Sequence, residues 1–258
     1  ATSIGIGRKG FFDSINGMNT NIVAIPENFQ KNYKFRSKYK APMPKFSLSD
    51  IGIPKAIEDK MEETSRLSVF CSYLAIKDAG FEIIDDGKYF KALGLESCST
   101  IIGVGIGGLQ SAFNSYMAHI NEKNESDSTK HRFNRMIIPM VMPNSAVAWP
   151  SIIFGLEGKS FTLNASCASG TMAIGEAYTG IKNGQYDVAL AGGVEALGEE
   201  NGAIMRGFDM IGALTTSGDG LPRPFSKRRT GFLFNDGAGC ILVLESLENA
   251  INRGAEIY

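Results

Sequence analysis

The chain has few of the residues that most often carry catalysis or hold metal ions. Its 258 residues include two histidines and four cysteines, and the cysteines are scattered, without a CxxC pair or metal-ligand spacing. This pattern argues against a metal site and against a disulfide framework. It is typical of a protein kept in a reducing cytoplasm.

Long apolar runs and a strong charge of either sign are also missing. No run approaches the ~20 apolar residues of a membrane span, and residues 1–10 lack the apolar core of a signal peptide. The formal net charge of -1 gives no sign of nucleic acid or a membrane surface as a partner. We therefore expect a cytoplasmic protein that binds neither.

Glycine, in contrast, is abundant. The 30 glycines cluster at predicted strand–helix junctions, as the turns of an α/β protein require. A hydrophobic content of 43% and a charged content of 21% are those of an ordinary globular protein. The length allows one large domain or two small ones.

The most informative stretch is 160–184, SFTLNASCASGTMAIGEAYTGIKNG. Phe161 and Leu163 alternate with polar residues, which predicts a half-buried strand. From Cys167 onward, small residues such as Ala173 and Ala177 continue at helical spacing, and Gly184 is a typical helix stop. A second apolar strand follows at 187–192. The pattern is strand–helix–strand, with a cysteine at the end of the first strand.

Cys167 is therefore a candidate nucleophile. The free N–H groups at a helix N-terminus stabilise negative charge, and the thiolate is the reactive form of cysteine. In α/β folds, sites gather at the carboxyl ends of strands. The small residues around it would let a long substrate and a neighbouring backbone approach closely. The alternative is a buried structural cysteine, which is our interpretation of Cys71, Cys98 and Cys240.

Two segments carry a resemblance to known families. NASCASGTMAIGEAYTGIKNGQYDVALAGGVEAL resembles the nucleophile segment of condensing enzymes with the thiolase fold. GLPRPFSKRRTGFLFNDGAGCILVLESLENAINRGAEIY is similar, more narrowly, to the β-ketoacyl synthases. The resemblance implies an α/β protein with a thiolase-like layered α/β/α fold and a mixed sheet. Residues 1–258 would form one N-terminal condensing-enzyme domain, the first of two pseudo-symmetric halves, with the C-terminal half absent from this chain.

The same resemblance implies an acyltransferase, a 3-oxoacyl-[acyl-carrier-protein] synthase of fatty acid or polyketide-type synthesis. Cys167 would take the acyl chain, and malonyl-acyl carrier protein would extend it by decarboxylative Claisen condensation. Ile106 and Phe208 match substrate-binding residues of the acyl pocket. No cofactor or metal is implied. The partners would be acyl carrier protein, acyl and malonyl thioesters, and a second copy in a homodimer formed around 137–158.

Three alternatives stay open. A thiolase uses the same fold and nucleophile, and Asn164 resembles its signature, while Ser166 departs from the alanine common in synthases. A non-catalytic partner subunit would usually lack the cysteine. The turn at 103–108, GVGIGG, matches the dinucleotide fingerprint G-x-G-x-x-G, but no strand with an acidic residue follows at the required distance. The better interpretation is a turn that lines the substrate channel.

The remaining expectations concern the groups around the nucleophile. Neither His119 nor His131 has a motif around it, and the family takes its decarboxylation histidines from its second half, so we expect the fragment alone to be inactive. A basic cluster of Lys130, Arg132 and Arg135 is a candidate docking site for an acidic carrier protein.

The segment 21–54 is predicted to be an irregular, solvated excursion. A helix is predicted over 55–79, a strand over 99–103 and a helix over 109–120, and regular helix in 137–158 is expected only after Asn144.

Overall fold

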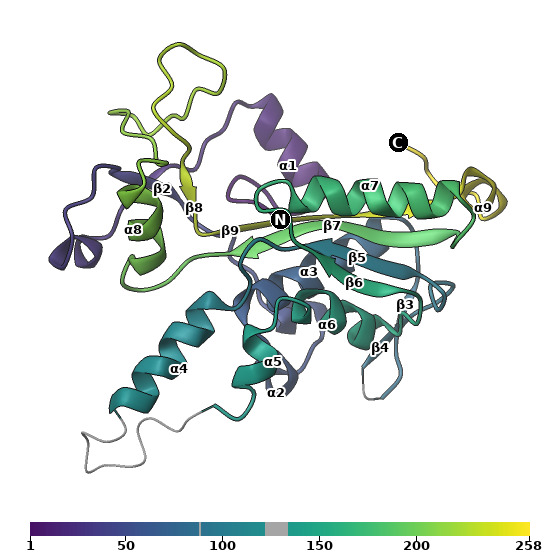
Figure 1. Cartoon of the computed structure of the whole chain (residues 1–258). Coiled ribbons are helices and arrows are strands. Elements are labelled where there is room, and N and C mark those ends of the chain that lie inside the picture. The colour runs from purple at the N-terminus through teal and green to yellow at the C-terminus, as the bar shows by residue number, and fades with distance from the viewer. Residues whose placement is uncertain (88, 122–133) are drawn as a thin grey trace. The chain divides into compact units, whose positions relative to one another are not determined.

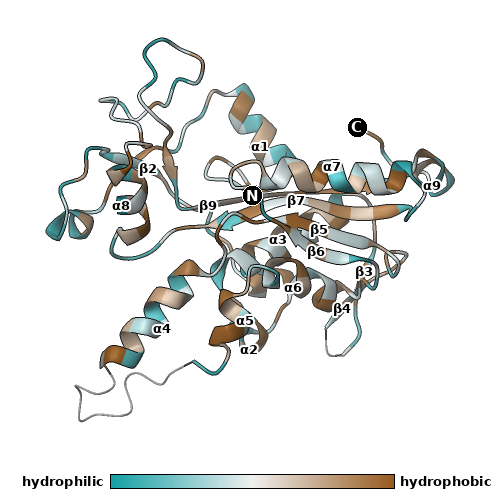
Figure 2. Ribbon diagram, in the orientation of Figure 1, coloured by the Kyte–Doolittle hydropathy of each residue, from teal (hydrophilic) through white to brown (hydrophobic). Residues whose placement is uncertain are grey.

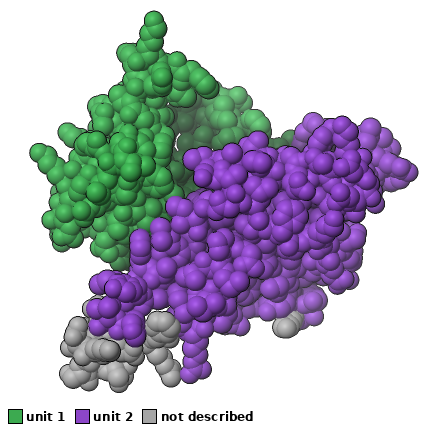
Figure 3. Space-filling view, viewed as in Figure 1, with its two compact units in different colours: residues 1–45, 196–238 green, residues 46–195, 239–258 purple. Residues whose placement is uncertain are grey.

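The chain divides into two compact units, which are described separately. The computed structural model describes residues 1–87, 89–121 and 134–258. Unit 1 comprises Ala1–Lys45 and Ala196–Ala238, and unit 2 comprises Phe46–Glu195 and Gly239–Tyr258 (Figure 3). Within the described ranges, no helix is both long enough and apolar enough to cross a bilayer.

Unit 2 is built on a four-stranded sheet with the order β6-β5-β7-β9. The strands are β5 (Ser99–Gly103), β6 (Ser160–Leu163), β7 (Val188–Ala196) and β9 (Gly237–Glu245). β5 runs parallel to both β6 and β7, and all five of its residues are buried. The strand predicted over 99–103 is confirmed, and it is buried throughout because a parallel strand is covered on both faces.

Helices cover both faces of this sheet (Figure 1). One face carries α7 (Ser169–Lys182), and the other carries α6 (Ser145–Phe154) with α3 (Glu63–Asp78). On α7, Ala173 and Ala177 are fully buried against Ile101, Ala189 and Ala191 of the sheet. The small residues of α7 therefore bring the helix close to the strands. The predicted close approach of a neighbouring backbone is therefore confirmed, and the approach of a long substrate stays a prediction.

The other elements of unit 2 include three that were not predicted, and two predictions about the helices were wrong. The elements are η2 (Leu48–Ile51), α2 (Lys55–Glu58), β3 (Ile83–Asp85), β4 (Phe90–Ala92), α4 (Leu109–Asn121), α5 (Ile137–Val141) and α9 (Leu247–Asn252). Of these, η2, β3 and β4 were not predicted. The predicted helix over 55–79 is two helices, because Glu62 caps a new helix by accepting the N–H groups of Thr64 and Ser65, each at 2.7 Å. Pro139 lies inside the short helix α5, so helix forms before Asn144 as well.

In unit 1, part of the segment 21–54, predicted to be irregular and solvated, is ordered and buried, although much of the segment is irregular and exposed. The segment contributes β1 (Val23–Ala24), η1 (Glu27–Lys31) and β2 (Tyr39–Ala41), alongside α1 (Gly7–Asn16), α8 (Ala203–Met210) and β8 (Phe234–Asn235). Ile25, Phe29 and Phe35 are buried. β2 pairs with β8 in parallel, from nearly the opposite end of the sequence. Local periodicity carries no trace of such a distant partner.

A single buried carboxylate ties this segment to α8. Asp209 accepts hydrogen bonds from the Tyr33 hydroxyl at 2.9 Å and from the backbone N–H groups of Arg36 and Ser37 at 3.1 and 3.0 Å. Burial raises the pKa of Asp209, but these hydrogen bonds and the Arg36 guanidinium outweigh it, so the pKa lies below its usual range. The ionised side chain therefore organises the basic segment around it.

Replacing this carboxylate should destabilise the protein strongly. We expect Asp209→Ala to lower the free energy of unfolding by about 3 kcal/mol, because it leaves buried N–H donors unpaired. Tyr33→Phe is the matched control, and it removes one of the same hydrogen bonds at a cost of about 1 kcal/mol. Urea unfolding of the two variants measures both values. An Asp209→Ala variant no less stable than Tyr33→Phe would contradict this role.

Candidate functional site

Cys167 lies between a strand and a helix, as predicted. β6 ends at Leu163 and α7 begins at Ser169, and the Cys167 side chain is exposed. Ser166 has a φ of 53°, in the left-handed region that residues other than glycine rarely adopt. Strained backbone of this kind persists where the surroundings hold it, and it is found at functional sites.

Ser169 holds the turn that presents Cys167. Its buried hydroxyl accepts the N–H of Ala165 at 2.8 Å and donates to the carbonyl of Ser166 at 2.6 Å. The backbone N–H of Ser169 donates to the same Ser166 carbonyl at 3.1 Å. These bonds close the turn around Cys167 and leave its sulfur on the outside.

The neighbouring turn, 103–108, is held by an unexpected partner. The carboxylate of Glu195, at the end of β7, accepts the backbone N–H groups of Gly105, Ile106 and Gly107 at 2.7, 2.8 and 3.0 Å. Burial raises the pKa of Glu195, and the three hydrogen bonds partly offset this. In a dinucleotide site, such N–H groups bind a phosphate. Here the protein's own carboxylate takes that place, which argues against nucleotide binding.

The structure brings Ile106 and Cys167 to the same end of the sheet. Gly103 and Leu163 are paired at the carboxyl ends of the parallel strands β5 and β6, and the two turns follow directly. The Asn164 amide donates to the Gly105 carbonyl at 2.8 Å and so joins the turns. Ile106 itself is 39% exposed. This is the edge of a parallel sheet where α/β proteins bind ligands.

Phe208, the third predicted site residue, lies on α8 of unit 1. Its ring is half-buried and contacts Phe232 edge-on, with centroids 5.7 Å apart, and Phe234 at 6.0 Å. This packing gives Phe208 a place in the core of unit 1. Its role in an acyl pocket stays a prediction.

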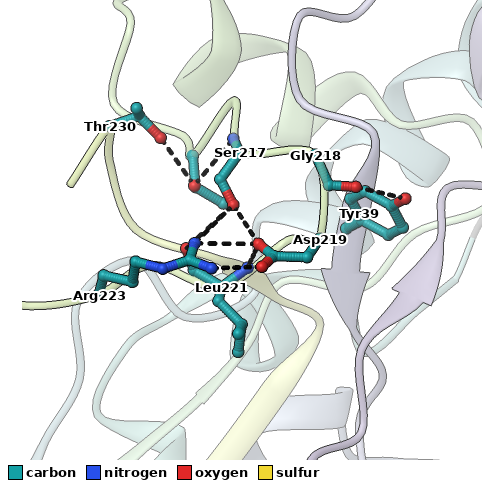
Figure 4. Close-up of polar contacts among 8 residues, drawn as sticks. Tyr39, Ser217, Gly218, Asp219, Leu221, Arg223 and Thr230 are labelled. Carbon is teal, nitrogen blue, oxygen red and sulfur yellow. Dashed lines mark hydrogen bonds and ion pairs between the residues drawn. The ribbon is translucent and has the colours of Figure 1, made fainter. Parts of the chain in front are cut away.

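Unit 1 also contains the loop that carries the RPF motif. Arg223 pairs with Asp219 and donates to Ser217 Oγ at 3.2 Å, and Asp219 accepts the Ser217 hydroxyl at 2.5 Å (Figure 4). The Thr230 hydroxyl accepts a hydrogen bond from the backbone N–H of Thr216, which joins the two ends of the loop. These contacts lower the pKa of Asp219 well below its usual range, first through the Arg223 hydrogen bond.

The loop borders an open depression of about 500 Å³, lined by Pro222, Pro224, Arg229, Thr230, Gly231 and Phe232. Arg223 and Phe225 have positive φ angles of 49° and 63°. The polar contacts therefore hold a strained loop in one conformation.

The other three cysteines, all predicted to be buried core residues, differ in their exposure. Cys71 and Cys98 are buried as predicted, but Cys240 is exposed, so its interpretation as a core residue was wrong. It alternates along β9 with the buried residues Gly239 and Ile241.

Other residues singled out from the sequence, Lys130, His131 and Arg132, lie outside the described residues. Across the described part of the chain, no group of three or more His, Cys, Asp or Glu side chains could hold a metal ion.

Comparison with known proteins identifies the family. The family model for the N-terminal domain of beta-ketoacyl synthases matches residues 2–250. The chain belongs to the β-ketoacyl synthase family. It is 33% identical over 215 residues to the 3-oxoacyl-[acyl-carrier-protein] synthase 2 of Staphylococcus aureus strain N315, which covers 83% of this chain and 48% of that synthase. The chain spans about half the length of the curated relatives it matches.

Solved structures confirm the predicted thiolase-like α/β fold. A beta-ketoacyl synthase from Burkholderia phymatum STM815 superposes with a TM-score of 0.77 at 26% identity, covering 99% of this chain and 59% of that one. A type II PKS ketosynthase, solved with its acyl-carrier protein and a hexaketide (AntDE:AntF), shares the fold with a TM-score of 0.78 at 20% identity. That match covers 100% of this chain and 58% of the other. The β-ketoacyl synthase chain thus has the fold its motifs predicted.

Glu195 and Ser169 are the site residues that the sequence analysis did not find. Glu195 is the one acidic residue in the small, apolar stretch AGGVEA, and that isolation is the only signal it gives. Its partners lie about 90 positions earlier in the chain. Ser169 follows Cys167 by two positions, and its hydroxyl has no distinguishing pattern.

Cys167 should be the most reactive thiol of the folded, full-length protein. Limited iodoacetamide labelling near neutral pH should modify Cys167 first, because it is exposed beside a helix N-terminus. Cys71 and Cys98 should stay unmodified, because burial raises the pKa of both thiols, to about 12 for Cys98. Peptide mapping by mass spectrometry reads the order of labelling.

Cys240 is the matched control within the same protein. It is exposed like Cys167 but sits within a strand, away from any helix start. If accessibility alone set the rate, iodoacetamide would label Cys167 and Cys240 equally fast. Equal labelling would therefore contradict an effect of the helix N-terminus, whereas at least a fivefold faster reaction at Cys167 supports it.

Proposed function

We propose that the protein containing this chain is a 3-oxoacyl-[acyl-carrier-protein] synthase. The observation that carries the proposal is the exposed Cys167 in a strand–turn–helix junction, at the carboxyl end of a parallel sheet in a β-ketoacyl synthase chain. The relative in Staphylococcus aureus bears the same activity in its name. The pathway would be fatty acid or polyketide-type synthesis, in the cytoplasm, and no cofactor takes part.

The reaction proceeds in two stages on Cys167. The thiolate attacks the carbonyl carbon of an acyl thioester, and the carrier's thiol leaves, so the acyl chain becomes attached to the Cys167 sulfur. A malonyl thioester then loses carbon dioxide, and the resulting carbanion attacks the acyl carbonyl. The Cys167 thiolate leaves, and the product is longer by two carbons.

Residues 1–258 supply only part of this chemistry. The backbone N–H of Cys167 is one donor for the oxyanion that forms during acyl transfer. Decarboxylation needs donors to the enolate oxygen, and we assign these to histidines outside residues 1–258. The chain would then be the first of two pseudo-symmetric halves, and inactive on its own.

The alternatives are less well supported. The thiolase alternative rests on Asn164, whose amide here bonds the Gly105 carbonyl and so has a structural use. A non-catalytic partner subunit would have no need for an exposed cysteine on a strained turn. Both observations favour the synthase.

The partners are an acyl carrier protein and a second copy of the chain. The ketosynthase of the type II PKS complex binds its acyl-carrier protein, and Arg135, exposed at the start of the predicted dimer region, would attract an acidic carrier. β6 forms an edge of the unit 2 sheet. Near the same region, α4 and α5 contact each other, and α5 is strongly hydrophobic (Figure 2). The two helices and the residue after α5 expose the apolar side chains Phe113, Tyr116, Met117, Ile138 and Met142. A homodimer would cover both features.

The test is chain extension by the full-length protein. With an acyl carrier-bound substrate and malonyl-acyl carrier protein, mass spectrometry should detect a product two carbons longer. Cys167→Ala should lower the rate at least about a thousandfold, because the covalent intermediate cannot form. Cys240→Ala is the control and should retain the activity. Extension by Cys167→Ala at the wild-type rate would overturn the proposal.

A further inference from the structure

We propose that Glu195 is a positioning residue that sets which acyl chains the protein accepts. Its carboxylate takes the place of an external anion at the 105–107 turn and thereby fixes Ile106 at the sheet edge that also carries Cys167. The inference rests on the proposed function for the identity of the substrate. Its structural part stands on contacts within unit 2.

The carboxylate and the turn fit each other closely. Glu195 Oε2 accepts two N–H groups, from Gly105 and Ile106, and Oε1 accepts the third, from Gly107. Three consecutive amides can point at one acceptor only in a tight turn, and Gly107 adopts a φ of +75° that favours glycine. A Cβ built at Gly105 would lie 2.6 Å from Glu195 Oε2. The turn therefore takes this shape around this carboxylate.

The turn is held from two sides. Glu195 reaches it from β7, and Asn164 reaches the Gly105 carbonyl from the segment that carries Cys167. Asn164 bonds only the Gly105 end. The N–H groups of Ile106 and Gly107 donate their hydrogen bonds to Glu195. Removing the carboxylate therefore releases this part of the turn, while the hydrogen bond from Asn164 to the Gly105 carbonyl remains.

Ile106 is the side chain that this part of the turn presents. It is 39% exposed, so it is available to a ligand at the carboxyl end of the sheet. A hydrophobic wall discriminates chains by shape, and a single methylene changes relative rates by about tenfold or more. Movement of Ile106 should therefore change the preference among acyl chains more than the reactivity of Cys167.

Glu195→Gln tests the inference with little change in volume. The amide retains one oxygen but turns an N–H₂ group toward a backbone N–H, so it cannot accept all three bonds. Glu195→Asp keeps the charge on a side chain shorter by one methylene, and it serves if the Gln variant does not fold. Glu248→Gln, at an exposed glutamate of α9, is the matched control.

Three quantities are measured on the full-length protein. They are hydrogen exchange in the peptide containing 105–107, the rates at which carrier-bound acyl chains of about four and about twelve carbons acylate Cys167, and the rate of Cys167 alkylation by iodoacetamide. For Glu195→Gln we expect exchange at least tenfold faster and a ratio of the two acylation rates changed at least fivefold. The alkylation rate should stay within twofold of wild type, and Glu248→Gln should match wild type throughout.

The contrary outcomes are distinct. Unchanged exchange would show that Glu195 does not hold the turn. Acylation rates that fall equally for both chains would indicate a purely structural role, and either result overturns the inference. A wild-type protein acylated by neither chain would instead contradict the proposed function, and with it the role in chain selection.

Discussion

The direct contact between the first turn of α7 and the sheet is the constraint on which the site depends. A Cβ at Gly103 would lie 2.2 Å from the carbonyl carbon of Ser169, and a Cβ at Gly193 would lie 2.8 Å from the Cα of Gly170. No side chain fits in either place. The helix therefore begins against the backbone of β5 and β7, and Cys167, two residues before the helix, is set at the edge of the sheet.

Polar contacts then hold the two turns beside the sheet, which this backbone packing does not fix. Ser169 closes the turn around Cys167, Asn164 joins that turn to the next one, and Glu195 holds the far side. Each bond pairs a side chain with backbone groups that regular structure cannot satisfy. Together they hold two irregular turns without any metal ligand or disulfide in the described part of the chain.

Much of unit 2 could be predicted because its signals are local. The alternation at 160–163, the strand at 99–103 and the junction at Cys167 each lie within a few residues, and all three have the predicted structure. The family resemblance added the fold, and the solved structures confirm it. The positions of Ile106 and Cys167 at one sheet edge follow from the parallel order of β5 and β6.

The parts that could not be predicted depend on distant partners. The segment 21–54 is ordered by Asp209, more than 170 positions away, and by the parallel pairing of β2 with β8. Glu195 binds a turn about 90 positions earlier. Cys240 has apolar neighbours on both sides in sequence, but the sheet leaves its face of β9 open. In each case the residue is visible in the sequence, but its contact partner or its exposure is known only from the fold.

The central claim is the proposal that Cys167 receives the acyl chain. The most direct measurement incubates the full-length protein with an acyl carrier-bound substrate without any malonyl thioester, digests it, and locates the added acyl mass by tandem mass spectrometry. The account predicts one acyl group per chain, on the peptide containing Cys167 and on its sulfur. An acyl group found on another residue, or no acyl group at all, would contradict it.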